Sequence, residues 1–489
     1  MLPFFLAFLA GGAGFRTVDV DAARVTGKIR SFQGVVDGPL VPRGRGDLSS
    51  QYKALRIDFI RIHDLFGPAD IDARWTQPDR IASGAGATGA NTIFPNWNAD
   101  PERSESYNFA PTDSFIQAMV GSGAQVCYRI GRSWSADPDP PPDFNKYANV
   151  VKHVAMHYNA GWARGFHDNI RYWEFWNEPD DQRAWNPQFI QPFWSGTPAQ
   201  FYALYEKVAR ALKSFDPNLK VGGPAKALGD VGGPYREGFI EYCAARGVPL
   251  DFYSWHDYFG SSYDPYDVVR VGQTTRQLLN ASGFRNAEIL ATEWNAGPGH
   301  GPARTSALPP MDAPAFVGAV LIYLQDSALQ HATYYRGDSG NRRLIAADGS
   351  LTPNANVFKA TGDMLDTPDR LAVTGADTLG FAVLAGRSTD GRRVRILIAN
   401  HEIPAEYREP RRGLARLPRQ TSIAYGNIRG YALRIANLPW GNAAFSVKRY
   451  HLSDTGGFNL QSLPAGHGSS FQLQQELAPP AVELIVLER

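Results

Sequence analysis

Short runs of apolar residues alternate with longer amphipathic stretches up to about residue 366. Apolar runs that are rich in β-branched and aromatic residues and bounded by turn residues are typical of buried strands. Eight such runs lie at residues 32–36, 59–63, 125–130, 172–176, 220–222, 252–256, 288–293 and 332–335. Strands that alternate with helical patterns favour a parallel βα architecture.

The stretches between these runs carry the period of amphipathic helices. They lie at residues 112–122, 147–158, 198–215, 235–246, 313–329 and 354–365. Thr197 is placed to cap the third of them and Gly247 to end the fourth. Eight strands in this alternation predict an α/β fold, a (β/α)8 barrel. The rival doubly wound sheet would bring a glycine-rich phosphate loop after its first strand, and the sequence has none there.

After residue 367 the pattern changes to short strands separated by turn signals such as Thr389-Asp390-Gly391. These strands lie at residues 379–387, 392–400, 430–438, 445–453 and 480–488. They predict a C-terminal all-β sandwich. We therefore divide the chain into an N-terminal segment (1–30) that adds a strand to the sandwich, the barrel (31–366) and the β-sandwich (367–489).

The charges of the chain nearly cancel, with 49 Lys and Arg against 48 Asp and Glu. This balance argues against a nucleic-acid partner or an anionic membrane partner. The two cysteines, Cys127 and Cys243, exclude a disulfide framework and a four-thiolate zinc site. We expect no cofactor.

An apolar run at residues 2–15 opens the chain. It is shorter than the about 20 residues that a membrane-spanning helix needs. Its length suits the apolar part of a signal peptide, but the positively charged start of one is missing. Cytoplasmic and exported locations both stay open.

The aromatic content is high, with 11 Trp, 21 Tyr and 27 Phe beside 48 Gly and 35 Pro. It suits an enzyme with long loops around a pocket that stacks on its ligand, and equally a large core with long loops. Trp173, Trp176, Trp255 and Trp294 lie at or near predicted strand ends, which favours the stacking pocket.

The strongest local signal is Trp173-Glu174-Phe175-Trp176-Asn177-Glu178-Pro179. An aromatic strand ends in Asn-Glu-Pro, so Glu178 lies at the C-terminal mouth of the predicted barrel, where barrel enzymes do their chemistry. Aromatic walls would raise the pKa of this carboxyl group, as a general acid requires. Asn177 is placed to hydrogen-bond a sugar hydroxyl.

A second strand, Ile289-Leu290-Ala291-Thr292, delivers Glu293 to its C-terminal end. If the two glutamates end strands four and seven, they face each other across the barrel mouth. Two carboxylates that flank one bond are the apparatus of glycoside hydrolysis.

Further polar and aromatic side chains end other predicted strands. They are Arg61, His63, His256, Tyr258, Trp294 and Tyr335. Apart from Arg61, we expect them to bind substrate, the polar groups at sugar hydroxyls and the aromatic rings by stacking on the sugar. We expect Arg61 to keep Glu293 ionised, and His256 or Tyr258 to orient it by a hydrogen bond. A metal site of His63, His256 and His300 is the alternative, but these histidines come from distant loops without a ligand motif, so we expect no metal.

Seven segments follow one another along the predicted barrel: RIHD (61–64), FPNWNADP (94–101), YRIGRS (128–133), YWEFWNEPD (172–180), KVGGPA (220–225), DFYSWHDY (251–258) and ATEWN (291–295). In combination they resemble the retaining glycosidases of clan A, and in detail glycoside hydrolase family 39. This resemblance implies a barrel with a terminal β-module, Glu178 as the acid/base and Glu293 as the nucleophile. It also implies that His63, Asn177, His256 and Tyr258 line the glycone subsite.

The resemblance implies an oligosaccharide or glycoside substrate, and β-D-xylosidase activity is our first expectation. α-L-Iduronidase, β-glucosidase, α-L-arabinosidase and endo-acting exopolysaccharide hydrolase are alternatives, and a non-catalytic carbohydrate-binding protein is a remote one. Arg132 and Arg336 are the cations that would serve a uronic acid. Arg132, Trp134 and the proline-rich segment 136–143 depart from the family pattern and leave the aglycone preference open. Monomer and homo-oligomer both stay open.

Overall fold

The computed structural model describes residues 14–41, 46–72, 91–133, 138–181, 193–229, 231–258, 264–295, 312–338, 343–346, 348–403, 425–452 and 457–489. Three features of the sequence analysis lie outside these residues, namely nearly all of the leading apolar run, Trp134 and His300.

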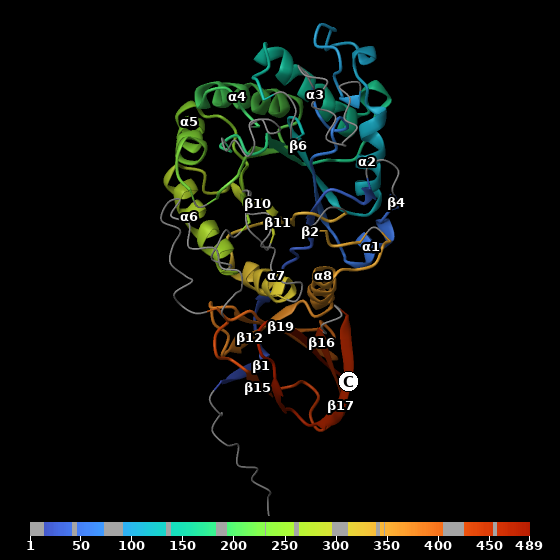
Figure 1. Ribbon diagram of the computed structural model, residues 1–489, viewed down its shortest axis with the longest axis vertical. Coiled ribbons are helices and arrows are strands. Elements are labelled where there is room, and N and C mark those ends of the chain that lie inside the picture. The colour runs from blue at the N-terminus through green and yellow to red at the C-terminus, as the bar shows by residue number, and fades with distance from the viewer. Residues whose placement is uncertain are drawn as a thin grey trace, which may run out of the picture.

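Eight parallel strands close into a barrel, and the last of them, β11, pairs back with the first, β2 (Figure 1). The strands are β2 (Gly34–Val36), β5 (Phe59–Ile62), β6 (Gln125–Ile130), β7 (Tyr172–Phe175), β8 (Lys220–Lys226), β9 (Phe252–Asp257), β10 (Glu288–Trp294) and β11 (His331–Tyr334). Every predicted apolar run overlaps one of these strands, so the barrel prediction is confirmed.

Helices surround the barrel (Figure 1). They are α1 (Ser49–Ala54), α2 (Ala110–Gly121), α3 (Phe144–Ala160), α4 (Pro198–Phe215), α5 (Phe239–Arg246), α6 (Asp267–Ala281), α7 (Asp312–Tyr323) and α8 (Pro353–Asp363). The side chains of Thr197 and Gln200 form a capping box at the start of α4, and Gly247 ends α5 with a left-handed φ of 57°. The hydrophobic pattern missed α1 and α6. The helix predicted at 313–329 also includes the short 3-10 turn Leu324–Asp326 that follows α7. The helix predicted at 235–246 begins within the π-helical turn Pro234–Gly238, which precedes α5.

The remaining long strands form one nine-stranded sheet in the order β17-β16-β19-β14-β13-β12-β1-β15-β18. Its members are β1 (Phe15–Lys28), β12 (Asp369–Thr374), β13 (Phe381–Arg387), β14 (Arg393–Asn400), β15 (Gly430–Ala436), β16 (Ala444–Leu452), β17 (Phe458–His467), β18 (Phe471–Glu476) and β19 (Ala481–Glu488). A separate pair, β3 (Leu40–Val41) and β4 (Gly46–Asp47), lies beside the barrel.

The nine-stranded sheet folds over so that its two halves enclose a core of their own. The hydroxyl of Tyr431 on β15 donates to Glu483 Oε2 on β19 at 2.6 Å. Because β14, β13, β12 and β1 lie between these two strands in the sheet, this contact requires the two halves to face each other. This is the arrangement of the predicted sandwich. The N-terminal strand β1 belongs to it, parallel to β15 and antiparallel to β12.

Helix α7 joins the barrel to the sheet, and it lies between them (Figure 1). Gly318 of α7 faces Ala399 of β14 so closely that a Cβ on the glycine would lie 3.2 Å from the alanine Cβ. One continuous apolar core therefore runs from the barrel through α7 to one face of the sheet. Within the described ranges, no helix has both the length and the apolar character to span a membrane.

Candidate active site

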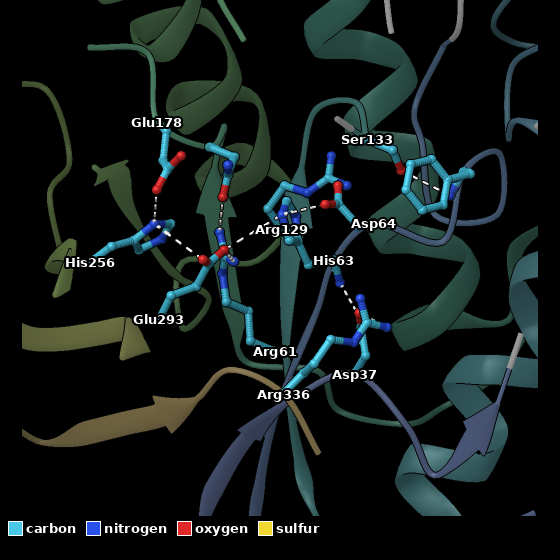
Figure 2. Close-up of polar contacts among 12 residues, drawn as sticks. Asp37, Arg61, His63, Asp64, Arg129, Ser133, Glu178, His256, Glu293 and Arg336 are labelled. Carbon is cyan, nitrogen blue, oxygen red and sulfur yellow. Dashed lines mark hydrogen bonds and ion pairs between the residues drawn. The ribbon is translucent and has the colours of Figure 1, made fainter. Parts of the chain in front are cut away.

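The C-terminal ends of four barrel strands bring a cluster of buried polar side chains together (Figure 2). Arg61 lies on β5, with His63 just after it. Asn177 and Glu178 follow β7, His256 lies on β9 with Tyr258 just after it, and Glu293 lies on β10. Each of these side chains is at least nine-tenths buried. The cluster lies at the end of the barrel where barrel enzymes carry their active sites.

The turn after β7, which positions Glu178, has an unusual backbone conformation. Trp176 and Glu178 have left-handed φ values of 70° and 42°. Hydrogen bonds to both neighbouring strands hold the turn, because Trp176 N donates to Ile130 O at 2.7 Å and Glu178 N donates to Ala225 O at 2.9 Å. Left-handed backbone at residues other than glycine costs about 1–3 kcal/mol each and gathers at functional sites.

A bulge in β10 aims Glu293 into the barrel. Leu290 faces the barrel interior. In a regular strand Thr292 would face inward with it, and Glu293 would face the helices. The register against β9 shifts between Ala291 and Glu293, which reverses this alternation and places Glu293 beside His256.

The two glutamates lie close together with His256 between them. One carboxylate oxygen of Glu178, one of Glu293 and a ring nitrogen of His256 all lie within 4.8 Å of one another. Nδ1 of His256 is 2.7 Å from Glu178 Oε1 and 3.6 Å from Glu293 Oε2. Figure 2 marks both contacts with dashed lines. A single bond of a substrate fits between two carboxylates at this separation.

Glu293 is held by donors on several sides. Nη1 of Arg61 donates to its Oε1 at 2.8 Å, and the hydroxyl of Tyr258 donates to its Oε2. His63 Nε2 lies 3.5 Å from the same Oε1. Burial raises the pKa of Glu293 above its ordinary value, while His256, Arg61 and the Tyr258 hydrogen bond oppose that rise. The carboxylate is thus buried and also surrounded by groups that stabilise its ionised form.

Both histidines of the site are neutral at neutral pH. Burial lowers the pKa of His63 to about 3 and that of His256 to about 4. Each ring therefore carries one N–H. Nε2 of His256 and Nδ1 of His63 have no hydrogen-bond partner among the described residues.

Glu178, His256 and Glu293 are the one group in the described part of the chain whose ligand atoms lie close enough to hold a metal ion. A protein zinc site usually has three or four ligands and needs space for the ion between them. Here Nδ1 of His256 and the Glu178 carboxylate already share a hydrogen bond. We therefore keep the expectation of no metal and no cofactor as a prediction.

The structure places most of the sequence-predicted site residues in this cluster. Tyr335 lies at its edge, with its ring 5.9 Å from that of Tyr258. Trp294 is a correction, because its side chain is fully buried on the outer side of β10. There it packs against Tyr334 and Phe358, on β11 and α8. The bulge that turns Glu293 inward turns Trp294 outward.

The predicted stacking pocket of four tryptophans is also corrected. Trp173 stacks on Tyr128 of β6, and Trp176 packs edge-on against Trp194. The ring of Trp255 packs so closely on Gly229 that a Cβ at this glycine would lie 2.7 Å from it. Like Trp294, Trp255 is fully buried. These rings fill the layer between strands and helices and form part of the core.

Sequence reasoning missed two buried acids beside the site. Glu174 on β7 is paired with Arg61, and a lone charge inside an aromatic strand was the signal that could have found it. Asp37, just after β2, accepts from the backbone N of His63 at 2.7 Å and pairs with Arg336 at 2.8 Å. No pattern in the sequence links Asp37 to the site.

The two arginines considered for a uronic acid are engaged in ion pairs. Arg132 pairs with Asp72 at 3.0 Å, and Arg336 pairs with Asp37 at 2.8 Å and with Asp338 at 2.9 Å. Neither arginine forms an ion pair with Glu178 or Glu293 in the described structure.

Comparisons with known proteins point to one family. Residues 102–335 match the sequence profile of glycosyl hydrolases family 39. A β-xylosidase from Geobacillus stearothermophilus is 31% identical over 198 residues, which are 37% of this chain and 36% of that protein. A β-xylosidase from Caldicellulosiruptor saccharolyticus is 27% identical over 315 residues, which are 60% of this chain and 59% of that protein. The chain thus matches less than two thirds of the length of either curated relative.

A solved structure extends the similarity over nearly the whole chain. A glucosidase from Croceicoccus marinus is 32% identical, with a TM-score of 0.81 over 97% of this chain and 99% of that chain. The matched residues, 102–335, include both glutamates of the cluster, Glu178 and Glu293. The chain therefore belongs to glycosyl hydrolase family 39.

Proposed function

We propose that this protein is a retaining exo-glycosidase that removes terminal β-D-xylosyl residues from xylo-oligosaccharides or xylosides. The observation that carries the proposal is the spacing of Glu178 and Glu293, whose nearest oxygens lie within 4.8 Å. Retaining glycosidases have carboxyl groups about 5–5.5 Å apart, whereas inverting enzymes keep about 6.5–9.5 Å to admit a water. The short separation favours retention.

In this mechanism Glu293 attacks the anomeric carbon while Glu178 protonates the leaving oxygen. The glycosidic bond breaks, a covalent glycosyl-enzyme ester forms on Glu293, and the aglycone leaves with the proton of Glu178. Glu178 then takes a proton from water, which attacks the ester and releases the sugar with its configuration retained. The hydrogen bonds from Arg61 and Tyr258 support the role of Glu293, because they stabilise the ionised form that a nucleophile needs.

The charges around the site support a neutral sugar. A uronic acid would need a cationic partner for its carboxylate, and Arg132 and Arg336 are already paired with buried aspartates. Glu293, which is ionised in the proposed mechanism, lies at the centre of the site and would repel another anion. Both observations favour xylose over iduronate, as do the names of the two curated relatives.

A β-glucoside is the second candidate substrate. The solved relative that covers nearly the whole chain carries the name glucosidase, and its 32% identity spans the barrel and the sheet alike. Glucose differs from xylose by the hydroxymethyl group at C5, so the space opposite C5 decides between the two sugars.

Steady-state kinetics on aryl β-xyloside, β-glucoside, α-L-arabinoside and α-L-iduronide test the specificity. We expect the highest kcat/KM on the xyloside, and a higher value on the glucoside would establish the second candidate instead. Proton NMR of the first product tests the mechanism, since retention requires the β-anomer to appear first. Release of the α-anomer first, or near-wild-type activity of Glu293→Ala, would overturn it. Monomer release from xylo-oligosaccharides separates exo from endo action.

A further inference from the structure

One cation at the centre of the site serves three acceptors. Nη1 of Arg61 donates to Glu293 Oε1 at 2.8 Å, and Nη2 donates to Asn177 Oδ1 at 2.8 Å. The third nitrogen, Nε, donates to Glu174 Oε2. Glu174 therefore fixes the orientation of the guanidinium group from inside the barrel. In that orientation its other two nitrogens donate to Glu293 and Asn177 in the site.

Glu174 lies fully buried inside the barrel, one layer below the site. Its Oε2 forms an ion pair with Arg61, and its Oε1 has no hydrogen-bond partner among the described residues. Burial, together with the nearby charge of Glu174, raises the pKa of the Cys127 thiol on β6, and Arg129 is the register neighbour of Glu174 on the same strand. A buried carboxylate with one oxygen unsatisfied is costly to keep, and such groups call for an explanation beyond fold stability.

We propose that Glu174 is a positioning residue that holds Arg61 in place and neutralises part of its positive charge. It thereby limits how strongly Arg61 stabilises the carboxylate of the nucleophile, Glu293. The inference rests on the proposed role of Glu293. Two carboxylates share one guanidinium, so neither receives its full stabilisation. The ionised form of Glu293 is thereby stabilised, but not so strongly that the carboxylate becomes a poor nucleophile.

None of the other described groups that face Glu293 is a cation shared with a second carboxylate. They are His63 on the β5 side, Glu178 after β7, His256 and Tyr258 on the β9 side, and Tyr335 on the β11 side. Both histidines are neutral, so Arg61 is the cation in direct contact with the Glu293 carboxylate. A carboxylate that partly neutralises Arg61, as Glu174 does, therefore weakens the stabilisation of the Glu293 carboxylate directly.

Replacement of Glu174 by glutamine removes the negative charge of the side chain and keeps its shape. The amide oxygen still accepts from Nε of Arg61, but the full positive charge now acts on Glu293. The pKa of Glu293 falls, so the acid limb of the pH profile of kcat/KM moves to lower pH by about one unit. The more stable carboxylate is a weaker nucleophile, and we expect kcat to fall about tenfold at the plateau.

The experiment compares pH profiles of wild type, Glu174→Gln and Glu174→Asp on the best aryl glycoside, with Glu288→Gln as the matched control. Glu288 lies at the other end of the barrel, where it pairs with Lys220 and the hydroxyl of Tyr172. We expect its profile to match the wild type. Glu174→Asp keeps the charge but shortens the side chain, so its acid limb should stay in place while kcat falls.

An unmoved acid limb in Glu174→Gln, with kcat/KM within twofold of wild type, would overturn the proposal. If Glu174→Gln does not fold by circular dichroism, Glu174→Asp decides. A tenfold loss of kcat with Tm within 3 °C of wild type supports the positioning role, and unchanged kinetics overturn it. Failure of the proposed function is seen separately, in wild type, as the absence of a covalent adduct on Glu293 with a 2-deoxy-2-fluoro glycoside.

Discussion

Nδ1 of His256 lies 2.7 Å from Oε1 of Glu178 and 3.6 Å from Oε2 of Glu293. One ring nitrogen thus faces both carboxylates of the pair. Burial lowers the pKa of His256 to about 4, so at neutral pH the ring carries a single proton. When that proton is on Nδ1, it can donate to whichever carboxylate is ionised, and in the proposed mechanism this role passes between Glu178 and Glu293.

We predict that His256→Ala lowers kcat/KM by about 10- to 100-fold, because Glu178 loses its hydrogen bond to His256 and the two glutamates lose a donor that faces both of them. Steady-state kinetics with an aryl glycoside measure the loss. His153→Ala is the matched control, since His153 lies on α3 and contacts Asn149 O, remote from the site. Equal losses in both variants would contradict a specific role for His256.

We predict that Glu178→Ala is rescued by azide and Glu293→Ala is not. Without the acid/base residue, hydrolysis of a substrate with a poor leaving group should fall by about 10²- to 10⁴-fold. An aryl glycoside with a good leaving group still forms the glycosyl-enzyme, and azide then enters the space of the lost side chain and attacks it. The product should be the β-glycosyl azide, identified by NMR. An α-glycosyl azide, or rescue of Glu293→Ala instead, would reverse the two assignments.

We predict that Tyr258→Phe moves the acid limb of the kcat/KM profile to higher pH by about one unit. The Tyr258 hydroxyl donates to Glu293 and lowers its pKa, so its removal raises that pKa, and the nucleophile becomes protonated at a higher pH. A hydrogen bond to a charged group contributes about 1.5–3 kcal/mol, which corresponds to one to two pKa units. Tyr253→Phe is the control, because its hydroxyl contacts Tyr235 O outside the site. The same shift in both variants would rule out this explanation.

Much of the fold follows from the hydrophobic pattern, since each of the eight predicted apolar runs overlaps a strand of the barrel. The pattern works there because barrel strands lie between a filled interior and a layer of helices, which demands apolar runs with defined ends. The α6 helix was overlooked although its buried residues, among them Val268, Val271 and Leu279, recur with a helical period.

The candidate site was harder to predict, because the aim of a side chain depends on local irregularity. Glu293 and Trp294 are adjacent, and the sequence placed both at the site, but the bulge in β10 sends one inward and the other to the core. The left-handed turn at Trp176 and Glu178 is equally absent from any pattern. Glu174 was overlooked because its pairing with Arg61 joins β7 to β5, across β6.

Two glycines outside the site provide a test of backbone effects on stability without a change in side-chain contacts. A Cβ at Gly247 or at Gly121 would meet no atom within 4 Å. Gly247 has a φ of 57° at the end of α5, so we predict that Gly247→Ala lowers the free energy of unfolding by about 1 kcal/mol. Gly121 lies within α2 without a left-handed φ, so Gly121→Ala should raise it by about 0.4–1 kcal/mol through a less flexible unfolded chain. Urea unfolding, with the m-value unchanged, measures the free energy of unfolding of both variants. The kcat/KM of both should stay at the wild-type value. If the free energy of unfolding changed in the same direction in both variants, the explanation from φ would be wrong.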